Sequence, residues 1–189
     1  MLHFCTYFDH RYAPRALALA ESLGRFVPTF QLWALCMDDP AFRMVSQIKS
    51  DRIRPVPLEE LESADPELRG VREHRSPIEY YFTCSPAFPL HLFSRHPEID
   101  LLTYLDADLF FFSSPDPLFD ELANDDVAII AHRFPPHLRD LEAFGKYNVG
   151  WLSFRKSNNG LRVLRWWRER CIEWCFDRCE NGKFADQKD

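Results

Sequence analysis

The chain has 189 residues, of which 46% are hydrophobic and 15% aromatic, and its formal net charge is −6. This length and apolar content suffice for one hydrophobic core, so the sequence predicts a single domain over residues 1–189. The acidic balance argues against nucleic acid as a partner, because binding of a phosphate backbone requires clustered Lys and Arg.

The first half of the chain alternates apolar runs with amphipathic segments, the pattern of strand followed by helix. The stretch 13–24 reads as a helix with Pro14 near its first turn and Gly24 at its end, just past the last helical residue. The acidic stretch at 59–70 reads as a solvated helix or loop. The predicted order is strand 2–8, helix 13–24, strand 30–36, helix 38–48 and a proline-containing edge strand 52–58.

The second half opens with a helix over 75–96, where Ser76 as N-cap, Pro77 and Glu79 form a capping-box pattern. The order then continues with strand 100–105, an extended run that resumes at 109–113, strands 127–132 and 149–155, and a long helix 159–179. Repeated strand and helix alternation predicts an α/β fold with a mixed, mostly parallel sheet flanked by helices. In such sheets ligands bind at the carboxyl ends of the strands.

The six cysteines do not form the pattern of a disulfide scaffold. Cys171, Cys175 and Cys179 recur every four residues, and we favour core packing over zinc binding because no fourth ligand lies nearby in the sequence. The chain has no eighteen-residue apolar run, so we expect no transmembrane segment, and its N-terminus lacks signal-peptide features. These observations predict a cytoplasmic protein, with peripheral contact at the inner membrane face as an alternative.

Two carboxylates, Asp106 and Asp108, interrupt the apolar run "LLTYLDADLFFF" at the end of a predicted strand. In extended backbone, residues i and i+2 point to the same side, so both side chains are expected to face one cation. Mg²⁺ and Mn²⁺ prefer oxygen ligands and combine one or two carboxylates with substrate phosphates. The pattern therefore indicates a metal and a diphosphate substrate, although an isolated Asp-x-Asp is more often a solvated turn.

The run at 101–112, followed by "YNVGWLSFR" at 147–155 and "FADQK" at 184–188, resembles the GT-A nucleotide-sugar glycosyltransferases, particularly bacterial relatives of family eight. The resemblance covers nearly the whole chain. It implies a GT-A (Rossmann-like) fold and transfer of a sugar from a nucleotide-sugar donor, UDP-linked, to a glycan or lipid-linked acceptor. It further implies that Asp106 and Asp108 hold Mn²⁺ or Mg²⁺ on the donor diphosphate.

The same resemblance implies roles for residues elsewhere in the chain. An Asp-Gln pair late in the chain lies near the reacting face of the sugar in that family, which gives Asp186 and Gln187 as catalytic candidates. The implied binding residues are Thr6, Tyr7 and Asp9 for the nucleoside, Arg75 for the phosphates or donor sugar, and Tyr147, Asn148 and Gly150 for the sugar and acceptor pocket. His132 is expected to be an ordinary strand-end histidine.

Two alternatives stay open at this point. Family members often complete the metal site with a His from a region later than the Asp-Gln pair. The sequence ends at "FADQKD" and does not include that region. A truncated or non-catalytic nucleotide-sugar-binding domain is therefore one alternative. The other is a phosphatase of the haloacid dehalogenase type, which uses a strand-terminal Asp-x-Asp with the first Asp as nucleophile.

Overall fold

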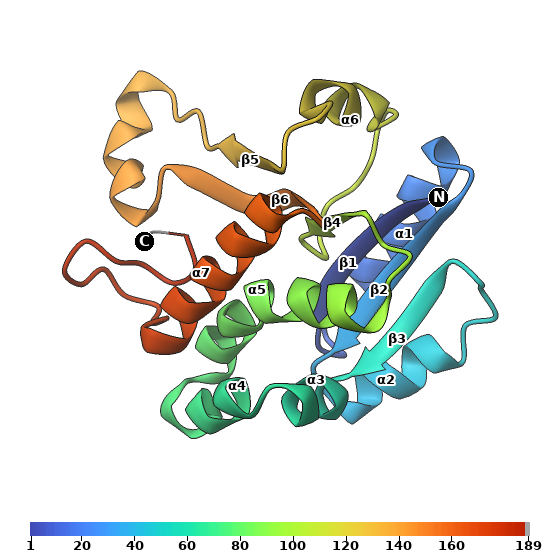
Figure 1. The fold of residues 1–189 in the computed structure, drawn as a ribbon, viewed down its shortest axis with the longest axis horizontal. Coiled ribbons are helices and arrows are strands. Elements are labelled where there is room, and N and C mark those ends of the chain that lie inside the picture. Colours follow the sequence, from blue (N-terminus) through green and yellow to red (C-terminus); the bar gives the residue numbers. More distant parts are fainter. Residues whose placement is uncertain (188–189) are drawn as a thin grey trace.

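A computed structural model describes residues 1–187. Its centre is a six-stranded sheet in the order β3-β2-β1-β4-β6-β5 (Figure 1). The first four strands in that order are parallel, and β6 and β5 are antiparallel to their neighbours. The strands are β1 (Leu2–Phe8), β2 (Phe30–Cys36), β3 (Ile53–Pro57), β4 (Leu101–Leu105), β5 (Val127–Ala131) and β6 (Tyr147–Arg155). The predicted mixed α/β class is confirmed.

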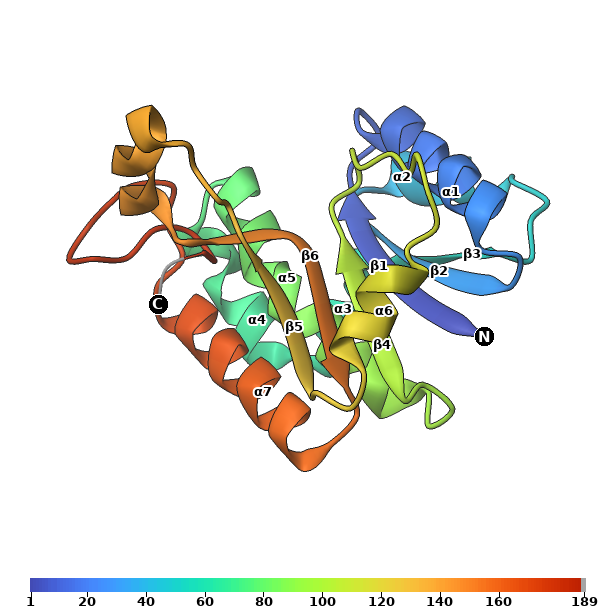
Figure 2. The same ribbon diagram turned by 90° about the horizontal axis from the view of Figure 1, so that it is seen from above.

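Helices cover both faces of the sheet, as Figure 2 shows from above. Phe4 and Cys5 are successive residues of β1, and both are fully buried because each face of the strand packs on a different helix layer. One layer is α1 (Ala13–Phe26) with α2 (Asp39–Ser46). The other contains α3 (Leu58–Ala64), α4 (Pro66–Val71), α5 (Pro77–Arg95) and α7 (Asn158–Glu173), while α6 (Asp116–Leu122) and the 3-10 segments η1 (Arg72–His74) and η2 (Pro136–Phe144) lie in the connections.

Helix α5 begins as its sequence predicts. The Ser76 hydroxyl accepts a hydrogen bond from the Glu79 backbone, and the Glu79 carboxylate accepts one from the Ser76 backbone. Two prolines inside the helix, Pro86 and Pro89, remove backbone donors, so the carbonyls one turn earlier lose their helical partners. The helix persists because its middle is buried over about two turns, from Thr83 to Pro89.

Several predicted boundaries were wrong. Gly24 lies inside α1, which continues to Phe26. The segment 109–113 forms no strand, because β1 and β6 already flank β4 and the chain turns away from them at Asp106. The stretch 59–70 is helical, and it is not fully solvated because Leu61 and Leu68 are buried.

The long C-terminal helix also ends earlier than predicted, at Glu173. Cys175 and Cys179 therefore do not continue the helical stripe that Cys171 begins. Cys171 and Cys175 are buried in the core, as expected, whereas Cys179 is exposed.

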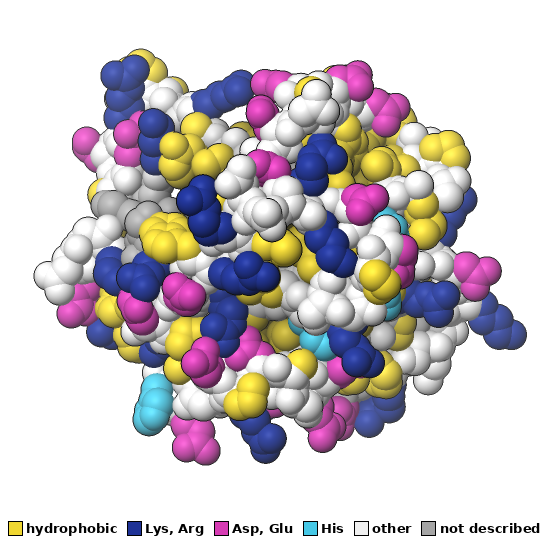
Figure 3. All heavy atoms as spheres, viewed as in Figure 1, with side chains coloured by type: hydrophobic (Ala, Val, Ile, Leu, Met, Phe, Trp, Pro, Cys, Tyr) yellow, Lys and Arg dark blue, Asp and Glu magenta, His cyan; other side chains and the backbone are white. Residues whose placement is uncertain are grey.

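Charged side chains of both signs are interspersed over the face drawn in Figure 3. Among residues 1–187, no helix is long and apolar enough to cross a membrane.

Candidate functional site

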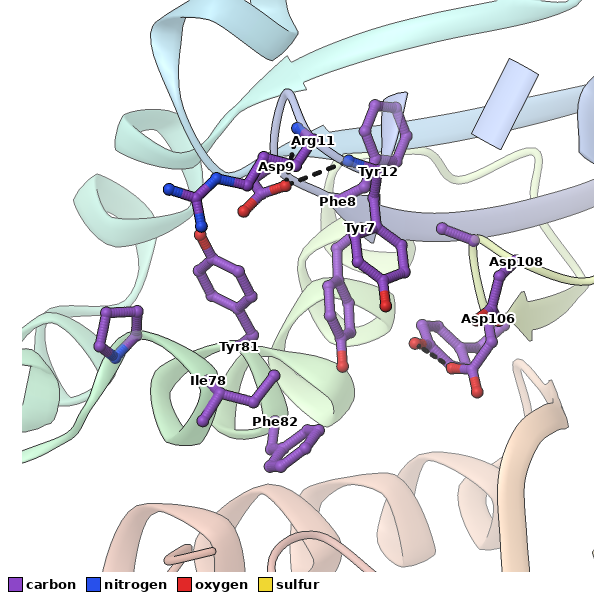
Figure 4. A pocket seen from close by; sticks show the side chains of 13 residues that line it. Tyr7, Phe8, Asp9, Arg11, Tyr12, Ile78, Tyr81, Phe82, Asp106 and Asp108 are labelled. Atoms are coloured by element: carbon purple, nitrogen blue, oxygen red, sulfur yellow. Dashed lines mark hydrogen bonds between the residues drawn. The ribbon is translucent and has the colours of Figure 1, made fainter. Parts of the chain in front are cut away.

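A cavity of about 390 Å³ opens at the carboxyl ends of β1 and β4, between these strands and the first turns of α5 (Figure 4). This is the place where ligands bind in open α/β sheets. Its walls are largely aromatic, and its charged groups are three carboxylates and one guanidinium. The residues that line it are Tyr7, Phe8, Asp9, Arg11, Tyr12, Pro77, Ile78, Tyr81, Phe82, Tyr104, Asp106, Ala107 and Asp108.

Asp106 and Asp108 both line the cavity, but their backbone is a turn rather than the predicted extended strand. The Asp106 N–H donates to the Gly150 carbonyl at 3.0 Å, and the Asp106 carbonyl accepts from the Leu109 N–H at 3.2 Å. Asp106 is partly buried, which raises its pKa, and the nearby charge of Asp108 raises it further. Asp108 is exposed, so the two carboxylates meet the cavity from its inner and outer sides.

A buried polar network connects Asp106 to helix α5. The Tyr104 hydroxyl donates to Asp106 Oδ1 at 2.8 Å, and the Ser85 hydroxyl donates to the Tyr7 hydroxyl at 3.1 Å. The Tyr7 and Tyr104 rings lie 5.6 Å apart, centroid to centroid. Burial raises the pKa of both phenols well above the usual value, so both hydroxyls keep their protons, and that of Tyr104 is donated to Asp106.

Asp186 joins this network from the irregular segment that follows α7. Its side chain is buried, which raises its pKa to about 7, and the charge of Asp106 contributes in the same direction. The indole Nε1 of Trp167 donates to the Asp186 backbone carbonyl at 2.8 Å and thereby holds the segment against α7. The two acidic residues Asp106 and Asp186, eighty positions apart in the sequence, thus influence each other electrostatically.

A second set of polar residues continues from Asp106 along β6. Gly150 donates its N–H to Asn148 Oδ1 at 2.6 Å, and a Cβ at position 150 would lie 3.2 Å from Asp106 Oδ2. The His132 ring lies within 3.4 Å of the Asn148 amide and 3.5 Å of Gln187 Oε1. The structure therefore brings Gly150, Asn148 and Gln187, through His132, into one chain of contacts that begins at Asp106.

A second cavity, of about 210 Å³, lies on the other side of these residues, against α7. It is mainly apolar, and Tyr147, Trp166 and Trp167 contribute to its walls. Asp186 and Gln187 line it as well, so the predicted catalytic pair lies beside this cavity rather than in the wall of the first.

Of the residues predicted to bind the nucleoside and phosphates, Thr6 and Arg75 do not line the first cavity. Thr6 is fully buried in β1. Arg75 instead donates to the Ile172 carbonyl in the last turn of α7, at 3.2 Å, and its guanidinium lies 4.0 Å from the centre of the Phe176 ring. Arg75 therefore caps the C-terminus of α7, where a cation is favoured, and a role with phosphates stays a prediction for this residue.

The carboxylates at 106 and 108 suit a hard divalent cation, because Mg²⁺ and Mn²⁺ are commonly held by one or two carboxylates together with substrate phosphates. Asp106 leaves its Oδ2 without a hydrogen-bond donor from the described side chains, and Asp108 is open to solvent. Within the described part of the chain, no three His, Cys, Asp or Glu side chains form a group that could hold a metal ion. The two carboxylates thus fit a cation whose other ligands come from substrate or water.

Several residues at the site were not predicted from sequence, including three with polar side chains. Arg11 supplies the guanidinium of the first cavity, Tyr104 supports Asp106, and His132 contacts Asn148 and Gln187. The position of Arg11 three residues after the end of β1 was the available signal, since loops at strand ends carry binding groups. Tyr104 reads in the sequence as an ordinary strand residue.

Comparison with known proteins places this site in context. No protein-family model matches the chain. It is 32% identical to the uncharacterized protein YfnF of Bacillus subtilis strain 168, over 97% of this chain and 62% of YfnF. It is 29% identical to YfnD of the same strain, over 98% of this chain and 60% of YfnD. The chain therefore spans about 60% of the length of these relatives.

Solved structures similar to this chain include glycosyltransferases. GlyE of Streptococcus pneumoniae TIGR4 superposes with a TM-score of 0.59 at 20% identity, over 98% of this chain and 41% of GlyE. Mouse xyloside xylosyltransferase 1 superposes with a TM-score of 0.58 at 15% identity, over 89% of this chain and 74% of the mouse chain. The galactosyltransferase LgtC superposes with a TM-score of 0.57 at 16% identity, over 91% of this chain and 64% of LgtC.

These similarities are at the level of fold, and they name no numbered family, so membership of family eight stays a prediction. They remove the basis for the haloacid dehalogenase alternative, which requires a different fold. The chain has the GT-A fold of nucleotide-sugar glycosyltransferases.

Proposed function

We propose that this protein transfers a sugar from a nucleotide-sugar donor to an acceptor. The observation that carries the proposal is the first cavity, in which Asp106, Asp108 and Arg11 face aromatic walls at the carboxyl ends of β1 and β4. Carboxylates for a cation, a guanidinium for phosphate and aromatic rings for a nucleoside are the groups that a nucleoside diphosphate sugar requires.

In this proposal the donor is UDP-linked and the cation is Mn²⁺ or Mg²⁺, held by Asp106 and Asp108. A divalent cation at this position supplies Lewis-acid stabilisation of the charge that develops on the leaving diphosphate. Arg11 adds positive charge at the cavity wall, and Tyr7, Tyr12 and Asp9 contact the nucleoside.

The acceptor side of the reaction is assigned to the residues between the two cavities. Asn148 and Gly150 form the wall beside the donor sugar, and Tyr147 contributes an exposed aromatic surface for a glycan or lipid-linked acceptor. Asp186 and Gln187 lie near the reacting face. A carboxylate whose pKa is about 7 can exchange a proton near neutral pH, which suits a group that assists transfer.

The test is ligand-dependent stabilisation. UDP at a hundred times its dissociation constant stabilises a folded protein by about 2.7 kcal/mol, so UDP with Mn²⁺ should raise the melting temperature clearly. EDTA should abolish most of the shift, and so should Asp106→Asn or Asp108→Asn. Asp120→Asn, an exposed aspartate on α6, serves as the matched control and should keep the full shift. Equal shifts with and without EDTA would contradict the metal role.

A non-catalytic nucleotide-sugar-binding domain is the second candidate. It is favoured by the cation site, where two carboxylates lie without a third ligand from any His, Cys, Asp or Glu of residues 1–187. Release of UDP from UDP-sugars in the presence of Mn²⁺ separates the two candidates. Turnover that is lost in Asp186→Asn supports transfer, whereas binding without turnover supports the second candidate.

A further inference from the structure

The carboxylate of Asp106 is held in one orientation by a residue that the proposed chemistry does not use. Tyr104 donates its hydroxyl proton to Asp106 Oδ1 at 2.8 Å, and its side chain is 2% exposed. Its backbone is fixed on both sides, because Tyr104 pairs with Cys5 of β1 and with Leu152 of β6. The hydroxyl therefore has a fixed position at the end of the central strand.

This fixed donor determines which oxygen of Asp106 is available. A carboxylate can rotate between two equivalent orientations, and rotation toward solvent would cost it little. With Oδ1 bound to Tyr104, the other oxygen, Oδ2, lies toward Gly150, whose missing side chain leaves room for it. An ionised carboxylate only accepts hydrogen bonds, so the Tyr104 proton must point at Asp106.

The surrounding groups hold the Tyr104 ring as well. The ring packs against Tyr7, whose own hydroxyl accepts a hydrogen bond from Ser85 in the middle of α5. A rotation of Tyr104 would therefore disturb both β1 and α5. The geometry is one in which a rigid buried phenol orients a partly exposed carboxylate.

We propose that Tyr104 is a positioning residue that orients Asp106 for the cation, so that Oδ2 is presented to the metal. This inference rests on the proposed function, because it requires Asp106 to bind a cation. Groups that orient a metal ligand through its second atom commonly contribute 10–100-fold to metal affinity. In this role Tyr104 acts through Asp106.

The structure offers a matched control at Tyr80. Tyr80 is also buried, at 3% exposure, and it donates its hydroxyl to the carboxylate of Glu62 at 2.9 Å. Tyr104→Phe and Tyr80→Phe thus each remove one buried phenol-carboxylate hydrogen bond and leave the ring in place. Only the first affects a carboxylate in the cavity.

The experiment measures Mn²⁺ affinity in the presence of saturating UDP, by electron paramagnetic resonance of free Mn²⁺. It compares the wild type, Tyr104→Phe, Tyr80→Phe and Asp106→Asn, and each titration is run well below the unfolding midpoint of the variant. We expect Tyr104→Phe to weaken Mn²⁺ binding by about tenfold or more. We expect Tyr80→Phe to retain wild-type affinity, although both variants unfold more easily than the wild type.

A double-mutant cycle provides the second measurement. When Asp106 is already Asn, the further change Tyr104→Phe should alter Mn²⁺ affinity little, because the group that Tyr104 orients no longer binds the cation. Equal Mn²⁺ affinity in Tyr104→Phe and the wild type would overturn the positioning role while the proposed function stands. A wild type that binds no Mn²⁺ with UDP would instead overturn the proposed function.

Discussion

The burial of Asp186 predicts a measurable dependence of folding stability on pH. Its carboxyl is buried in the folded protein, which raises the pKa from 3.8 to about 7. The folded protein therefore binds a proton at Asp186 between these two pH values, whereas the unfolded chain does not. The contribution of Asp186 to stability is greatest below pH 4 and is lost as the pH rises to 7.

The size of the effect follows from the pKa difference of about three units. Each unit corresponds to about 1.4 kcal/mol, so ionisation of Asp186 should remove ~4 kcal/mol of unfolding free energy between pH 4 and pH 7. Asp186→Asn carries no charge at any pH. The difference in stability between this variant and the wild type should therefore grow with pH and then become constant above pH 7.

Urea unfolding at several pH values between 4 and 8, in EDTA, measures this difference. Taking the difference between the two proteins removes the contributions of other carboxylates, such as Asp65, whose lowered pKa acts in the opposite direction. Asp177→Asn is the control, because Asp177 is an exposed carboxylate in the same segment. If the curves for Asp186→Asn and the wild type stay parallel from pH 4 to 8, Asp186 does not titrate as its burial requires.

Three further predictions concern other parts of the molecule. In Gly150→Ala, the new Cβ would lie 2.7 Å from the side-chain amide oxygen of Asn148 and 3.2 Å from Asp106 Oδ2. We therefore expect the unfolding free energy in urea to fall by about 1 kcal/mol and Mn²⁺ binding with UDP to weaken. Unchanged Mn²⁺ binding would contradict the contact with Asp106. In Arg168→Met, the largely buried Asp65 loses its ion-pair partner between α7 and α4, so unfolding free energy should fall by ~3 kcal/mol, and a change near zero would refute this. In Arg11→Ala, UDP affinity measured by calorimetry should fall about tenfold and depend less on salt, while the melting temperature without ligand stays as in the wild type, because Arg11 is exposed.

Much of the fold could be predicted from local patterns. The strands at 2–8 and 30–36 have the predicted bounds, since most residues on both faces of each strand are buried. The run at 109–113 misled the prediction for a physical reason. Phe111 packs against Trp151 in the core while Phe110 and Phe112 are exposed, so the alternation is that of a strand although no neighbouring strand pairs with it. The Phe111 N–H donates instead to the Ser22 hydroxyl.

The candidate site could be predicted only in part. Asp106 and Asp108 stand out because charge interrupts an apolar run, and both line the cavity. The positions of Asp186 and of Arg75 depend on contacts across about a hundred residues, which local patterns do not encode. In the sequence, Arg75 looks like an ordinary surface cation. Its hydrogen bond to the Ile172 carbonyl at the end of α7 follows from how α5 and α7 pack.

The site is assembled from two parts of the chain that differ in how firmly they are held. Asp106 follows a central strand, whereas Asp186 belongs to the irregular segment after α7, where an isolated bridge between Glu180 and Lys183 stands in place of a strand ladder. Segments with few backbone bonds open at lower free energy than the sheet, and their amide hydrogens exchange faster. Opening of this segment would carry Asp186 out of the site while the sheet stays folded. Heating should therefore inactivate the protein at a temperature below the one at which its circular dichroism changes.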